Sequence, residues 1–300
     1  MAPKTLMDFI SESQHIMKAH LRHFYTLTLL FLVPISFSFI LSLTLFHLFN
    51  LHQRITTNTI PSSLIIFLLL YSLFVSLFST CGVISISYSV FHFFNDQLPV
   101  NLQSSIRSIP VSFLPLLATT LVSQAIVFCI SLLYAFLLVL LTHDVAELVG
   151  GTGLFFAAFP LLIVLIYLQV NWNLVPAIVI LESCWGLEPL RRSARLMKGM
   201  KGVAMSSFFF YGFCTVFSVL SCLSVMRDSD GNTENWFSGV WNWVYVVVAS
   251  FLLAMIMLSN IGVNTVLYIY CKANHGEIAE DFGREYVSLP FHDGNVTYSV

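Results

Sequence analysis

The chain has 300 residues, of which 57% are apolar and only 9% are charged, and its mean hydropathy is +0.85. Soluble proteins carry roughly 25% charged residues, so this chain has too few polar side chains to cover a surface that faces water. The net charge of −2 excludes a nucleic-acid binder of the basic-domain kind, and the low Gly and Pro counts exclude a collagen-like chain.

Six apolar runs are long enough to cross a bilayer, which takes about 20 helical residues. They lie at residues 25–49, 64–90, 111–141, 152–174, 203–226 and 243–270. The predicted fold class is therefore all-α, an integral membrane helical bundle of six transmembrane helices with cytosolic interfacial amphipathic helices. The chain divides into a cytosolic amphipathic segment, a six-span transmembrane domain and a cytosolic tail, at residues 1–23, 24–270 and 271–300.

The distribution of basic residues predicts the orientation. With both termini in the cytosol, eleven of the 13 Lys and Arg residues lie on the cytosolic side and two outside. This asymmetry follows the positive-inside rule. The first 23 residues carry Asp8, Glu12, Lys18 and Arg22 among their apolar residues, so we expect no cleaved signal peptide there.

A short amphipathic segment precedes each odd-numbered span, at residues 5–24, 102–109 and 187–200. All three contain an aliphatic-X-X-Ser step, or a looser form of it. The steps end at Ser13, Ser108 and Ser193, which are 95 and 85 residues apart. Either the chain is three copies of an interfacial helix followed by a two-span hairpin, or any interfacial helix before a hairpin looks alike.

The segment at residues 171–202 concentrates the motifs of the chain. Glu182 lies near the cytosolic end of the fourth span, where an unpaired carboxylate is costly, so we expect it to pair with Arg191 or Arg192 across a bend at Gly186. The helix that follows is basic and interfacial. The candidate structural or lipid-headgroup motif consists of Glu182, Arg191, Arg192, Ser193, Arg195 and Lys198. It either stabilises the helix elbow or binds anionic lipid headgroups at the 187–201 helix.

The spacing of this segment resembles a known motif. Its residues are Pro176, Glu182, Gly186, Leu190, Arg192, Ser193, Leu196 and Gly199. They look like the P-x(5)-E-x(3)-G-x(3)-[AL]-x-R-S-x-x-L-x-x-G step of the membrane domain associated with glycerophosphoryl diester phosphodiesterases. The N-terminal stretch FISESQHIMKAHLRHF is similar to a group of uncharacterised plant multi-pass membrane proteins that carry the same step. The resemblance implies a helical membrane domain and no catalytic residues, because the phosphodiesterase chemistry belongs to a separate soluble barrel.

The sequence contains no catalytic set, no cofactor motif and no metal-ligand spacing. His15, His20 and His23 fall on the amphipathic N-terminal segment, where a solvated helix face explains them. We therefore expect a non-enzymatic protein. The competing interpretation is a small-solute channel or transporter, lined by Gln124, Asn171, Asn260 and Asn264. Such amides more often form hydrogen bonds between helices.

The expected function is that of a lipid- or partner-organising component of the plasma membrane or an endomembrane such as the endoplasmic reticulum or Golgi. Its expected partners are the bilayer, anionic headgroups and other membrane proteins, with no nucleic acid. Tyr286 and Leu289 in the tail fit the Tyr-X-X-bulky pattern that sorting adaptors read, with a tail resting on the membrane as the alternative. Cys184 lies at a predicted membrane edge, where it is a candidate for palmitoylation or a small apolar filler.

Overall fold

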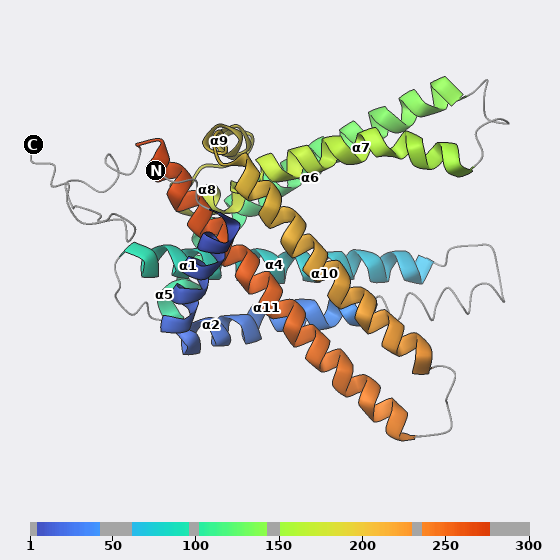
Figure 1. The fold of residues 1–300 in the computed structure, drawn as a ribbon, viewed down its shortest axis with the longest axis horizontal. Coiled ribbons are helices and arrows are strands. Elements are labelled where there is room, and N and C mark those ends of the chain that lie inside the picture. The colour runs from blue at the N-terminus through green and yellow to red at the C-terminus, as the bar shows by residue number, and fades with distance from the viewer. Residues whose placement is uncertain (1–4, 43–61, 96–101, 143–150, 230–235, 277–300) are drawn as a thin grey trace, which may run out of the picture.

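The computed structural model describes residues 5–42, 62–95, 102–142, 151–229 and 236–276, and these are helical with no strand among them (Figure 1). The first part comprises α1 (Leu6–Ala19), α2 (Leu21–Leu27), the π-helical turn η1 (Thr28–Leu32) and a helical continuation over 33–42. The middle part comprises α4 (Ser62–Asn95), α5 (Leu102–Arg107), α6 (Ile109–Thr142), α7 (Gly151–Asn171) and α8 (Val175–Glu182). The last part comprises α9 (Glu188–Leu196), α10 (Lys201–Ser229) and α11 (Trp236–Asn274).

Six helical stretches are long and apolar enough to cross a membrane, which confirms the predicted all-α, six-helix class. They are Leu21–Ser42, Ile65–Phe94, Ile109–Val139, Ala158–Glu182, Lys201–Ser224 and Trp243–Asn274. Helices suit a bilayer because each backbone N–H and C=O group is satisfied within the segment. The fourth stretch runs past its predicted end, since a short break between α7 and α8 bends the helix without ending the span. The predicted end of the first span, at residues 43–49, lies outside the described residues.

The spans form three hairpins that diverge from a common end. In Figure 1 the helices α1, α5 and α9 all lie at this end, and the hairpin of α6 and α7 points away from that of α10 and α11. The second helix of each hairpin occupies the centre of the common end, where α4, α8 and α11 contact one another. Ile86, Ile178 and Leu267 are fully buried there, and Thr265 of α11 donates a hydrogen bond to Ser87 of α4 over 3.2 Å. Toward the diverging ends, apolar side chains such as Phe136 are exposed, as expected of surfaces that face lipid.

Helix α1 packs on the other helices through its apolar face. Phe9, Ser13 and Met17 are buried, and Phe9 meets Tyr270 of α11 edge to face at a centroid distance of 5.3 Å. Gly262 of α11 lies directly beneath Ser13. The sequence predicts an amphipathic helix at this position, and its apolar face lies against α11 and α4 because burying that stripe between helices gives it close-packed neighbours.

Helix α5 corrects the register of the proposed repeat. Ser105 is fully buried, whereas Ser108, the serine assigned from the sequence, is half-buried and donates to the backbone oxygen of Ser105. Ser105 contacts Ser89 of α4 at 2.9 Å between hydroxyl oxygens, and His23 Nε2 lies 2.9 Å from Ser89. Ser105 therefore corresponds to Ser13 and Ser193. The short aliphatic-X-X-Ser pattern was ambiguous because residues 104, 105 and 108 are all serines.

Candidate functional site

The site is built on the short helix α8 and on the sharp turn that joins it to α9. Pro176 lies in the first turn of α8, where a missing N–H costs nothing. Ser183 ends α8 in the left-handed conformation, with φ of 54°, and Gly186 follows with φ of 81°. Pro189 then occupies the first turn of α9. This turn sends α9 back along α8, so that the two short helices lie against each other.

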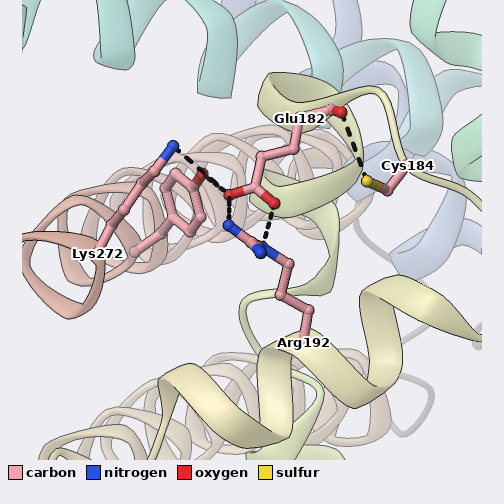
Figure 2. A network of polar contacts seen from close by, with 5 residues as sticks. Glu182, Cys184, Arg192 and Lys272 are labelled. Carbon is pink, nitrogen blue, oxygen red and sulfur yellow. Dashed lines mark hydrogen bonds and ion pairs between the residues drawn. The ribbon is translucent and has the colours of Figure 1, made fainter. Parts of the chain in front are cut away.

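Glu182 is the centre of a polar network at the end of α8 (Figure 2). Arg192 Nη2 donates a hydrogen bond to Glu182 Oε1 over 2.9 Å, and Arg192 Nε forms an ion pair with Oε2. Tyr268 donates its hydroxyl hydrogen to Oε1 over 2.7 Å. Lys272 Nζ lies 3.6 Å from the same oxygen. The carboxylate thus binds groups from both α9 and α11, and the expected pairing of Glu182 is confirmed, with Arg192 as the arginine.

The burial of this network determines its energetic role. The side chain of Glu182 is 11% exposed, that of Lys272 is 10% exposed and that of Arg192 is 28% exposed. A charge that is removed from water requires close opposite charges and hydrogen bonds. Glu182 has two cations and a hydroxyl donor, which makes a fixed junction between α8, α9 and α11.

Ser193 binds the end of α7, just before α8 begins. Its hydroxyl donates a hydrogen bond of 2.6 Å to the backbone oxygen of Asn171, at the end of α7. This carbonyl lies at a helix terminus, where backbone oxygens lack helical partners. The adjacent residues Arg192 and Ser193 therefore bind the end of α8 and the end of α7. Ser193 thus satisfies a backbone oxygen at a turn that lies 22 residues away in the chain.

The remaining basic residues of α9 and of the turn after it are exposed. They are Arg191 and Arg195 on the helix and Lys198 just past its end, at spacings of four and three, and we call them the α9 stripe. The opposite face is buried through Leu190, Leu196 and Met197. The turn before α9 exposes Trp185 by 70% and Leu187 by 51%. A cationic stripe beside exposed apolar side chains suits the boundary between headgroups and hydrocarbon.

Cys184 lies in the turn between α8 and α9. Its Sγ is 3.5 Å from the backbone oxygen of Glu182. Burial raises the pKa of the Cys184 thiol above its usual value, and the nearby carboxylates of Glu188 and Glu182 raise it further. The thiol is therefore a poor nucleophile at neutral pH, because only the thiolate reacts readily.

Of the four amides proposed to line a solute pathway, only Asn260 and Asn264 are joined to each other by a hydrogen bond among the described residues. Asn173 donates to Asn264 over 2.8 Å, and Asn264 donates to Asn260 over 3.1 Å, so these side chains bind one another. Asn171 donates to the backbone oxygen of Tyr167 within its own helix. Gln124 is exposed on α6, and the structure does not bring it to the others.

Two residues of the site are missing from the motif proposed on sequence grounds. Tyr268 and Lys272 of α11 contact Glu182 across 86 and 90 residues of chain. The available signal was a polar series at a spacing of four along α11, formed by Asn260, Asn264, Tyr268 and Lys272. Residues at this spacing share one helix face. The candidate sorting residues Tyr286 and Leu289 lie outside the described residues.

Within the described part of the chain, no group of three or more His, Cys, Asp or Glu side chains could hold a metal ion. Comparison with curated proteins found no match, and comparison with solved structures found none either. One family matches residues 3–282, which is most of the chain. The chain belongs to the family described as Domain of unknown function (DUF8558).

Proposed function

We propose that this protein is a non-enzymatic, multi-pass membrane protein that binds anionic phospholipid headgroups at the cytosolic leaflet and thereby organises lipid or partner proteins. The observation that carries the proposal is that the two faces of α9 have different surroundings. Its apolar face and Arg192 are engaged inside the protein, whereas Arg191, Arg195 and Lys198 are exposed beside the ends of two spans. Each such cation near an anionic leaflet contributes up to about 1 kcal/mol.

The orientation with both termini in the cytosol is part of this proposal, and it rests on the basic asymmetry of the sequence. Glycosylation acceptors inserted next to Asn58, Glu147 and Asn232 should all be modified in microsomes. An acceptor placed beside Lys198 should stay unmodified. The reverse pattern would put the α9 stripe on the outer side and contradict the proposal.

Lipid binding is tested by native mass spectrometry of the detergent-purified protein with equal amounts of phosphatidylserine and phosphatidylcholine. We expect preferential retention of phosphatidylserine. The triple variant Arg191→Gln, Arg195→Gln, Lys198→Gln should weaken the preference at the α9 stripe by about tenfold or more, given up to about 1 kcal/mol per cation. The charge-preserving variant Arg191→Lys, Arg195→Lys, Lys198→Arg should keep it. Equal retention of both lipids by the wild type would contradict the proposal.

The relation to plant membrane proteins and to the membrane domain of glycerophosphoryl diester phosphodiesterases stays a proposal, supported by the motif around Glu182 and Arg192. Residence in the plasma membrane or an endomembrane is likewise a proposal. A small-solute channel has less support, because Asn173, Asn264 and Asn260 bind one another. Liposomes that hold the purified protein and conduct ions, with conduction lost in Asn260→Leu, would favour the channel.

A further inference from the structure

The three short helices at the common end are equivalent in sequence. Residues 10–18 read ISESQHIMK and residues 190–198 read LRRSARLMK, so an aliphatic residue, a serine, an aliphatic-Met pair and a lysine recur at the same spacing. With Ser105 as the matching serine, residues 102–110 read LQSSIRSIP and keep the aliphatic residue and the serine. The three helices therefore share one register, centred on Ser13, Ser105 and Ser193.

Burial supports the same register. The three serines are each no more than 1% exposed. The positions two residues before each serine are exposed, as are those two and five residues after it. These exposed positions hold Ser11, His15 and Lys18 on α1, Gln103, Arg107 and Pro110 in the α5 segment, and Arg191, Arg195 and Lys198 on α9.

The helices also dock in the same way. Ser193 of α9 binds the end of α7, the second helix of the preceding hairpin, and Ser105 of α5 binds α4, which has the same place in its own hairpin. Ser13 of α1 lies against Gly262 of α11, the second helix of the last hairpin. The arrangement is thus cyclic, since the first unit closes on the third. The three short helices then lie together at one end of the molecule (Figure 1).

We propose that α1 and α5 carry two further binding sites for anionic phospholipid headgroups, equivalent to the α9 stripe and weaker than it. The site on α1 uses Lys18 with His15, and the site on α5 uses Arg107. The charges explain the order of affinity, because the α9 stripe has three cations, α1 has one Lys and a His, and α5 has one Arg. This inference rests on the proposed function of α9 and extends it to a bilayer-facing ring of three sites.

The experiment counts bound lipids by native mass spectrometry during titration with phosphatidylserine. The wild type should retain three, of which one binds most tightly. The triple Gln variant of the α9 stripe should still retain two. In that background Lys18→Gln with His15→Gln should remove one, Arg107→Gln should remove the other, and each cation lost should weaken its site by about fivefold. Arg107→Lys should keep its lipid.

The matched control is Arg22→Gln, because Arg22 is exposed on α2 but has no equivalent position on α5 or α9. It should leave the count at three. Melting temperatures of all variants should match the wild type, since the substituted side chains are exposed.

A phosphate anion from solution has the same chemistry as a headgroup, so inorganic phosphate at millimolar concentration is added as a competitor. If the lipid stays bound in the presence of phosphate, the sites bind headgroups of the bilayer. If phosphate displaces the lipid, this assignment to bilayer lipid is overturned.

The outcomes separate this inference from the proposed function. If the α9 variant retains no phosphatidylserine while the wild type retains one, α1 and α5 are not sites and the α9 site stands. If the α9 variant retains two lipids and neither is lost with Lys18→Gln or Arg107→Gln, α1 and α5 are not the equivalents of the α9 stripe. If the wild type shows no preference for phosphatidylserine, both proposals fail.

Discussion

Arg192 reaches back over ten residues to Glu182, and its Nη2 donates to Oε1 across 2.9 Å. The same carboxylate binds Tyr268 and Lys272 on the last helix. The two partners of the ion pair are consequently not equivalent. Removal of the carboxylate takes the shared anion away from two cations, whereas removal of Arg192 leaves Glu182 with a second cation and a hydroxyl donor.

Glu182→Gln should therefore lower stability more than Arg192→Gln, with a cost of about 3 kcal/mol for the former because two cations lose the carboxylate at once. The double variant should recover part of the loss. Thermal unfolding in detergent measures all three. Arg191→Gln is the control and should have little effect, because Arg191 is exposed. Strictly additive losses would show that the pair is not coupled.

Gly262 and Ser13 define the contact between α1 and α11. A Cβ at Gly262 would overlap Ser13 Oγ and lie 3.4 Å from Met17 Cε, so Gly262→Ala should destabilise the protein by about 1–3 kcal/mol. Adding Ser13→Ala removes the overlapping oxygen and should restore much of the loss. Gly212→Ala is the matched control, because nothing lies within 4 Å of its Cβ position. If the two glycine variants melt alike, α1 is not packed closely on α11.

Two of the three equivalent serines, Ser193 and Ser13, should differ in their contribution to stability. Ser193 donates to a buried backbone oxygen, so Ser193→Ala should cost about 1–2 kcal/mol. Ser13 Oγ is buried without a hydrogen-bond partner within the described residues, so Ser13→Ala should be neutral or stabilising. Chemical or thermal unfolding of both variants gives the comparison. A larger loss for Ser13→Ala would contradict this assignment.

Cys184 should react slowly with maleimide at neutral pH. Its thiol pKa is raised by burial and by the carboxylates of Glu188 and Glu182, so the thiolate forms only as the pH rises beyond the usual range for cysteine. The rate, followed by peptide mass spectrometry, should still climb at a pH where an ordinary thiol has levelled off. Glu188→Gln removes one of the carboxylates and should move the profile to lower pH. An unchanged profile would contradict the contribution of Glu188 and leave burial and Glu182 as the causes.

The membrane class and the Glu182 pairing were accessible from the sequence because both depend on simple physical limits. An apolar run of about 20 residues fits a bilayer, and a carboxylate at its edge needs a nearby cation. The sequence left Arg191 and Arg192 as alternatives, since a small change in the turn exchanges them. Ser183 in the left-handed conformation determines that turn, and serine has no strong preference for it.

The contacts of α11 could not be predicted in this way. Tyr268 and Lys272 meet Glu182 only because α8 and α11 pack together, and hydropathy does not specify which spans are neighbours. The cyclic docking of α1 has the same origin. Its helical periodicity indicates an apolar face, but a membrane surface and a neighbouring helix both satisfy such a face.

The contact of α1 with α11 has a consequence for biosynthesis. Helix α1 is made before α11, and α11 is the helix against which Ser13 and Phe9 pack. At roughly 5–20 residues per second, translation separates the two by tens of seconds. Before α11 is made, α1 can contact α2, α4 and α10, but it lacks the helix against which Ser13 and Phe9 pack. Completion of α11 is therefore the event that allows the ring of hairpins to close, and chains truncated before α11 should remain open to proteolysis within α1.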